Sequence, residues 1–253
     1  MGIRSRIISH LSEGMINYPE INALWLEGSD GTSTSDHLSD IDVVIHVNSG
    51  FETKALSICE NLLEEIAALD ISYEEPRQHS NMRYKVFHLE NTPSYLFIDV
   101  NVYSHRPFIE FDRFNDSEVP IVLFDKKQVI QIREHNESEL QQTLRNRLYH
   151  LENTIKQKAR VEKYIERNKF IEAIGYYHKF IISPLVEVLR IKYKPINHDY
   201  YIVCISKHLP REIAQQLEDL YKVTSIEDIS KHTQQAYQWF YEVLKDVQNN
   251  LNE

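Results

Sequence analysis

LWLEGSDGTSTSDHLSDIDVVIHV, residues 24–47, is the stretch that decides how the first half of the chain is expected to fold. It predicts a strand, a tight turn at Gly28-Ser29, a polar loop and a second strand. Side chains on a strand alternate between its two faces, so Asp40 and Asp42 are expected on one side. The apolar residues Ile41, Val43 and Ile45 alternate with them and are expected to point into a core.

Two carboxylates on one face of a strand repel each other, and no nearby residue in the sequence offsets this repulsion. A divalent cation between the oxygens would remove the conflict, and Mg²⁺ is often held by one or two carboxylates together with substrate phosphates. A lone Asp-x-Asp is usually a solvated strand end, and Gly-Ser between strands is usually only a turn. Their combination at this spacing is rarer and indicates a metal site.

A third acid, Asp99, lies in the middle of a predicted strand over 95–103 and is flanked by Ile98 and Val100. A carboxylate in such surroundings is costly to bury without a partner. If this strand lies beside the one that carries Asp40 and Asp42, the same metal is its partner. The alternative is a partly exposed aspartate on an edge strand.

These residues resemble the signature of the polymerase-beta-like nucleotidyltransferases, which is a Gly-Ser turn followed by Asp-x-Asp at the start of the next strand. Here it stands as Gly28-Ser29 and Ser39-Asp40-Ile41-Asp42, and the resemblance is most specific to the small antibiotic-modifying members of the kanamycin and lincosamide type. The segment IDVNVYS, residues 98–104, resembles their later acidic strand. Many relatives also carry a basic residue in the loop after Gly-Ser, but DGTS, residues 30–33, has none. The resemblance covers about the first half of the chain.

The resemblance implies a metal-dependent enzyme that moves NMP, expected to be AMP, from a nucleoside triphosphate to a hydroxyl of a small molecule and releases pyrophosphate. The expected acceptor is an aminoglycoside- or lincosamide-like compound, and the expected co-substrate is ATP. Two Mg²⁺ ions would be held by Asp40, Asp42 and Asp99, and the nucleotide would be contacted by Gly28, Ser29 and Ser39.

In the antibiotic-modifying relatives a glutamate on a helix of the C-terminal half is the general base. Glu172, on an otherwise apolar predicted helix, is the first candidate here, and Glu187 is the second. Either one, taken singly, is more often an ordinary glutamate on a helix surface. Lys192, within a basic cluster with Arg190 and Lys194, is a candidate triphosphate contact. A solvated helix end, which the helix dipole favours, explains the same cluster.

The pattern of the chain predicts an α+β protein in two parts. Residues 1–130 are expected to form a small mixed β-sheet nucleotidyltransferase domain with flanking helices. Residues 131–253 are expected to form an all-α antiparallel helical bundle that supplies the acceptor wall of a cleft between the domains. The predicted strands beyond 24–47 are 83–89, 95–103 and 121–124, with 107–120 as a surface loop. The predicted helices are 2–15, 51–69, 137–167 (or a broken pair), 170–193 with a kink at Pro184, 198–208, 211–221 and 226–249.

The composition bounds the function. The 253 residues carry a net charge of −10, which lacks the basic footprint of a protein that grips nucleic acid. No apolar run reaches the ~18 residues of a membrane span, and no secretory signal is visible, so a cytoplasmic protein is expected. Cys59 and Cys204 are expected to be buried free thiols. Homodimers occur among the relatives, so the resemblance allows a homodimer.

Two other functions compete with a small-molecule transferase. One is a protein-directed AMP transferase of the toxin-neutralising type, although its stand-alone versions tend to lack an appended helical half. The other is a non-catalytic nucleotide-binding module, which would predict the loss of one of the three acids.

Overall fold

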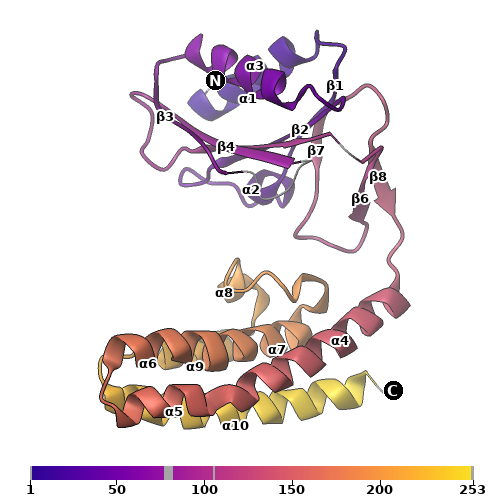
Figure 1. The fold of residues 1–253 in the computed structure, drawn as a ribbon. Helices are drawn as coiled ribbons and strands as arrows, with labels where there is room; N and C mark the ends of the chain where they lie inside the picture. Colours follow the sequence, from indigo (N-terminus) through magenta and orange to yellow (C-terminus); the bar gives the residue numbers. More distant parts are fainter. Residues whose placement is uncertain (1, 77–81, 105, 252–253) are drawn as a thin grey trace. The chain divides into compact units, whose positions relative to one another are not determined.

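The computed structural model describes residues 2–76, 82–104 and 106–251, and shows an α+β chain in two compact units, 1–135 and 136–253 (Figure 1). The predicted boundary at residue 130 falls inside a strand, β8 (Ile130–Arg133), which pairs with β6 (Ile109–Asp112) of the first unit. The boundary therefore lies a few residues later than the sequence indicated.

The first unit is built on a mixed six-stranded sheet with the strand order β3-β4-β5-β2-β1-β7. Its central pair, β2 and β5, is parallel, and the other neighbours are antiparallel. In the register of this central pair Asp42 lies opposite Asp99. The strands are β1 (Ile21–Leu26), β2 (Ile41–Val47), β3 (Leu69–Glu74), β4 (Met82–Leu89), β5 (Ile98–Tyr103) and β7 (Ile121–Asp125).

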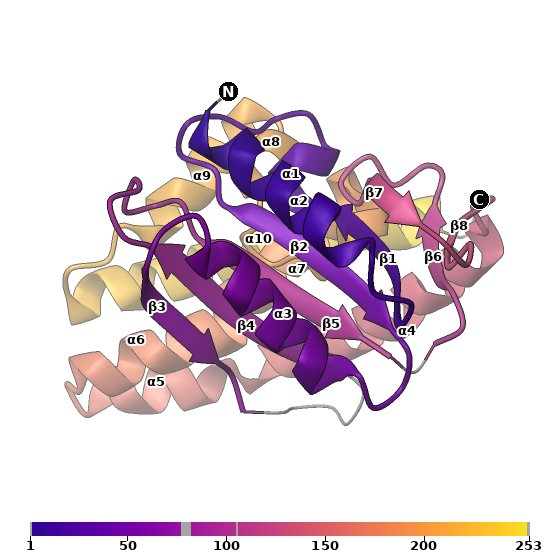
Figure 2. The same ribbon diagram turned by 90° about the horizontal axis from the view of Figure 1, so that it is seen from above.

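The two faces of this sheet have different covers. Helices α1 (Ile3–Met15) and α3 (Glu52–Glu64) lie across one face, where Ile41, Val43 and Ile45 join the buried core as predicted (Figure 2). The opposite face carries a smaller cluster around buried Trp25 and Val44, to which β6 and β8 contribute. Asp42 alternates with Val43 along β2, so its side chain belongs to this second face.

Two predictions for the first unit are wrong in part. The helix expected over 51–69 ends at Glu64, because residues 65–68 form a turn that leads into β3, a strand that the sequence did not indicate. This strand is at the edge of the sheet and is largely exposed, so it lacks the apolar alternation that marks a half-buried strand. The predicted loop 107–120 contains the short strand β6.

The second unit is helical over its described residues and packs around one core of leucines, isoleucines and aromatic side chains. The helix expected over 137–167 is a broken pair, α4 and α5, and α10 runs back in the opposite direction (Figure 1). A π-helical turn over His178–Ile182 separates α6 from α7, with Pro184 in the first turn of α7. The helices are α4 (Glu137–Ile155), α5 (Ala159–Glu166), α6 (Phe170–Tyr177), α7 (Ser183–Tyr193), α8 (Ile205–His208), α9 (Arg211–Tyr221) and α10 (Ile226–Asn250).

The predicted helix 198–208 is wrong except for its last turn, α8. Arg190 is fully buried and donates hydrogen bonds to the carbonyls of Tyr201 (2.5 Å) and Val203. These carbonyls accept from the guanidinium and not from the backbone N–H groups of a following helical turn. Tyr201 and Cys204 also adopt left-handed backbone angles, which a right-handed helix does not allow. Cys204 is exposed, contrary to the prediction, whereas Cys59 is buried.

Within the described part of the chain, none of the helices combines the length and apolar character needed to cross a bilayer.

Candidate metal centre

The three acids singled out by the sequence lie together in the first unit. Asp40 directly precedes β2, Asp42 is on β2, and Asp99 is its register partner on β5. One carboxylate oxygen from each residue can be chosen so that all three lie within 4.8 Å of one another. The structure therefore brings together residues that are far apart in the sequence, because the parallel pairing of β2 and β5 aligns the starts of both strands.

The electrostatics of this cluster are those of carboxylates without a counter-charge. Burial, followed by the charges of Asp40 and Asp99, raises the pKa of Asp42 to about 6. Burial is also the main reason why the pKa of Asp99 is raised, and Asp40 adds to it. Over residues 2–76, 82–104 and 106–251, no lysine, arginine or histidine forms an ion pair with any of the three. An all-oxygen donor set of this charge fits Mg²⁺ or a similar hard cation.

Tyr84, on β4, is a neighbour of the cluster that the sequence did not reveal. Its hydroxyl donates a hydrogen bond of 2.5 Å to Oδ1 of Asp99. The bond lowers the pKa of Asp99, in opposition to burial, and fixes the direction of one carboxylate oxygen. Tyr84 lies opposite Asn101 in the register of β4 against β5. Asn101 and Asp99 are two residues apart on β5 and share one face, so this register brings the Tyr84 side chain to Asp99.

Glu27 adds a fourth carboxylate near the cluster. Its Oε1 accepts a hydrogen bond of 2.7 Å from Nε1 of the buried Trp25, and burial raises the pKa of Glu27. Its charge contributes to the raised pKa of Asp42. The feature of the sequence that points to Glu27 is its position directly after the apolar end of β1 (Ile21–Leu26).

Gly28 lies directly against the carboxylate of Asp42. Its φ is +60°, and a Cβ atom at this position would be 1.9 Å from Oδ2 of Asp42. Only glycine permits this approach, because any other residue would collide with the acid. The predicted tight turn is a single helical turn, α2 (Gly28–Gly31), and within it the Oγ of Ser29 is buried without a hydrogen-bond partner among the described residues.

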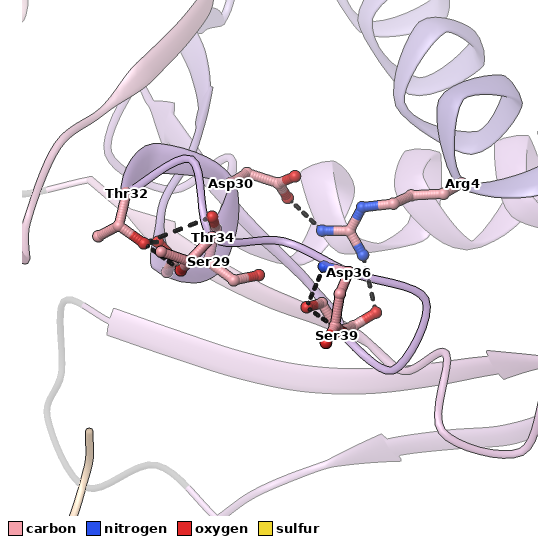
Figure 3. Close-up of polar contacts among 8 residues, drawn as sticks. Arg4, Ser29, Asp30, Thr32, Thr34, Asp36 and Ser39 are labelled. Atoms are coloured by element: carbon pink, nitrogen blue, oxygen red, sulfur yellow. Dashed lines mark hydrogen bonds and ion pairs between the residues drawn. The ribbon is translucent and has the colours of Figure 1, made fainter. Parts of the chain in front are cut away.

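Arg4, in the first turn of α1, joins the two segments that flank the acids (Figure 3). One terminal nitrogen donates to the carbonyl of Ser39 at 2.8 Å, and the other pairs with the carboxylate of Asp30. The guanidinium therefore fastens α2 to the residue that precedes Asp40. The loop after Ser29 has no basic residue of its own, and Arg4 of α1 is the basic residue that pairs with its Asp30.

Ser39, a predicted nucleotide contact, has its hydroxyl engaged within its own loop. The Oγ accepts a hydrogen bond of 2.9 Å from the backbone N–H of Asp36 (Figure 3). This bond shapes the loop just before Asp40, and a nucleotide contact of Ser39 stays a prediction.

The predicted site residues of the second unit differ in their local surroundings within that unit. Glu172 is exposed on α6, and Lys192 pairs with Asp246 at 2.8 Å. The second base candidate, Glu187, is buried and accepts hydrogen bonds from Arg147, one of them 2.8 Å long. Arg190, which belongs to the same basic cluster as Lys192, is buried, and its guanidinium is bound to backbone carbonyls and to the ring of His208. Glu172 and Lys192 remain predictions from the resemblance.

No protein-family model matches the chain, and no curated protein matches it in sequence. The interpretation of the site therefore depends on its geometry and chemistry.

Proposed function

We propose that the chain is a metal-dependent nucleotidyltransferase that moves NMP, in the first instance AMP from ATP, to a hydroxyl of a small molecule. The observation that supports this proposal most strongly is the meeting of Asp40, Asp42 and Asp99 beside the Gly28-Ser29 turn. The proposal assigns the nucleotidyltransferase domain to the first unit and acceptor recognition to the helical unit. An aminoglycoside- or lincosamide-like acceptor is the first class to test.

In the proposed reaction an acceptor oxygen forms a bond to the α-phosphorus, the bond from that phosphorus to the bridging oxygen breaks, and pyrophosphate leaves with its electron pair. Asp40, Asp42 and Asp99 would hold divalent cations, expected to be two Mg²⁺ ions, and these supply charge neutralisation of the phosphates. The chain's own contribution is positioning, which is a large part of such catalysis. The buried, unpartnered Oγ of Ser29 is available to donate to a phosphate oxygen.

The proton of the acceptor hydroxyl needs a base. Glu172 is the proposed base, on the strength of the resemblance and of its exposed position on α6. Glu187 is a weaker candidate for the base than Glu172, because its carboxylate is already paired with Arg147. Lys192 would have to exchange Asp246 for a phosphate in order to contact the nucleotide.

The test is pyrophosphate release from ATP and Mg²⁺, screened over aminoglycosides, lincosamides and protein lysates. Release that depends on an aminoglycoside or a lincosamide, and that is lost in Asp42→Asn, would support the proposal. Label transfer to protein instead would favour the protein-directed AMP transferase. ATP binding without release for any acceptor would favour a non-catalytic module, and ATP binding indifferent to both Mg²⁺ and Asp42→Asn would refute all three.

Loss of release in Glu172→Gln, with Mg²⁺-dependent ATP binding intact, would assign the base. Unchanged release in this variant would exclude Glu172 as the base without affecting the metal centre.

A further inference from the structure

A pocket of about 460 Å³ lies at the other end of the strands that carry the acids. Asp42 is near the start of β2, whereas His46 lines the pocket from near its end, and Ser104 follows the end of β5. The walls also include Asn22, the second residue of β1, and Lys127, which precedes β8, together with Asn48 and Arg106. This pocket is therefore separate from the metal centre.

The pocket is lined by positive charge, whereas the chain as a whole has a net charge of −10. Two cationic residues, Arg106 and Lys127, line it, and among the residues that the structure describes no aspartate or glutamate does so. The whole chain has 38 acidic and only 28 basic residues, so a pocket with cations and no acids is the reverse of the average surface. The ammonium of Lys127 donates to Oδ1 of Asn48 at 2.9 Å, which uses one of its three donors. Such a pocket favours an anion.

A buried hydrogen-bond relay shapes one wall of the pocket. Nε2 of His46 lies 2.7 Å from the carbonyl oxygen of Arg106, so this nitrogen must carry the proton and donate it. Nδ1 of His46 is then the acceptor for the side-chain amide nitrogen of Asn22, at 3.1 Å. The relay fixes the backbone of Arg106 and the orientation of the Asn22 amide.

The relay leaves one polar atom without a partner. Asn22 is only 3% exposed, and its Oδ1 has no hydrogen-bond partner in the described part of the chain. A buried acceptor without a donor is costly, and such atoms are rare in native proteins unless a ligand or water satisfies them. This oxygen has less than 1 Å² of accessible surface, so a hydroxyl or an amine on a ligand would satisfy it after a small movement of the pocket wall beside Asn22.

We propose that this pocket binds a small hydroxylated anion, with its phosphate or carboxylate on Arg106 and Lys127 and its hydroxyl on Oδ1 of Asn22. Guanidinium and ammonium groups together suit an anion with several oxygens. The guanidinium donates two parallel hydrogen bonds to two of the oxygens, and the ammonium acts as a point charge beside another. The hydroxyl contact gives the pocket a preference for organic anions over inorganic ones. The site does not depend on the proposed transferase activity.

The test is calorimetric titration of the metal-free full chain with inorganic phosphate, glycerol phosphate and glycerate. The proposal predicts that at least one hydroxylated anion binds more tightly than inorganic phosphate, and that Lys127→Gln or Arg106→Gln weakens binding about tenfold. Glycerol phosphate binding more tightly than glycerate would identify phosphate as the anionic group, and the reverse order would identify carboxylate. Asn22→Ala should remove the preference for the hydroxylated anion and leave binding of inorganic phosphate in place.

The matched control is Lys54→Gln, because Lys54 is an exposed lysine of the same unit that does not line the pocket. It makes the same change of net charge and should leave binding unchanged. Equal losses in Lys54→Gln and Lys127→Gln, or no binding of any of the three anions, would overturn the proposal. Loss of anion binding in Asp42→Asn would place the anion at the metal centre and would also overturn the proposal. Intact anion binding in this variant, together with no transferase activity, would support the pocket independently of the proposed function.

Discussion

Replacement of Gly28 by alanine is the substitution whose effect follows most directly from the geometry of the metal centre. The backbone at Gly28 has φ +60°, and forcing a side chain into this left-handed region costs about 1–2 kcal/mol. The new Cβ would also be 1.9 Å from Oδ2 of Asp42. Since non-bonded heavy atoms pack at about 3.5 Å, the carboxylate or the turn must move by roughly 1.5 Å.

A movement of this size is large compared with the tolerance of a metal site. Mg²⁺ requires its ligand oxygens close to about 2.1 Å in near-ideal octahedral geometry, so a displaced Asp42 can no longer share an ion with Asp99. Gly28→Ala is therefore expected to lose about 1–2 kcal/mol of stability and to weaken divalent-cation binding at least about tenfold. The assays are urea unfolding without metal and calorimetric titration with Mn²⁺.

Gly50→Ala is the matched control. Gly50 also has a left-handed φ, +89°, but no atom lies within 4 Å of the position that its Cβ would take. It should lose only the stability that the left-handed backbone costs, about 1–2 kcal/mol, and bind Mn²⁺ like the parent protein. The reasoning is refuted if Gly28→Ala binds Mn²⁺ normally, or if Gly50→Ala weakens binding to the same extent.

Three further predictions concern the residues around Gly28. Burial and neighbouring acids raise the pKa of Asp42 to about 6 in the folded protein, whereas in the unfolded chain this acid has its ordinary pKa of 3.8. Between these two pH values the folded protein binds more protons than the unfolded chain, so the free energy of unfolding falls as the pH rises toward about 6. Asp42→Asn should thus stabilise the metal-free protein more at about pH 7.5 than at about pH 5 in urea unfolding, and a gain that is independent of pH would contradict this. Arg4→Gln removes both bonds of the guanidinium and should cost about 1–3 kcal/mol while weakening Mn²⁺ binding, and unchanged binding would show that the loops do not need Arg4. Tyr84→Phe removes a donor to Asp99 and should raise the pKa of this acid further. NMR titration of the carboxyl carbons in the metal-free protein measures this pKa, and an unchanged value would argue against the hydrogen bond.

The sequence predicted the parts of the centre that depend on strand alternation. Asp40 and Asp42 share a face because the period of a strand is two, and Ile41, Val43 and Ile45 are buried on the other face for the same reason. The position of Asp99 next to Asp42 could be predicted only on the further assumption that the strand of Asp99 lies beside the strand of Asp42. The parallel register of β2 and β5 fulfils it.

The residues that the sequence missed act across elements. Tyr84 reaches Asp99 only through the register of β4 and β5, and Arg4 reaches Ser39 and Asp30 from a helix near the start of the chain. Neither spacing nor periodicity carries such information, because both describe a single element at a time. The interpretation of Arg190 failed for a related reason: its basic neighbours indicated a charged surface, whereas its partners are backbone carbonyls of residues 201 and 203 and the ring of His208.

The central claim is that Asp40, Asp42 and Asp99 hold a divalent cation in common. The most direct measurement is Mn²⁺ binding by electron paramagnetic resonance, with Mn²⁺ standing in for Mg²⁺, on the parent protein, Asp99→Asn and Glu172→Gln. Asp99→Asn is expected to lose the tightly bound ion, and Glu172→Gln is expected to retain it, because Glu172 is proposed as the base and not as a metal ligand. Equal Mn²⁺ binding by Asp99→Asn and the parent protein would contradict the account.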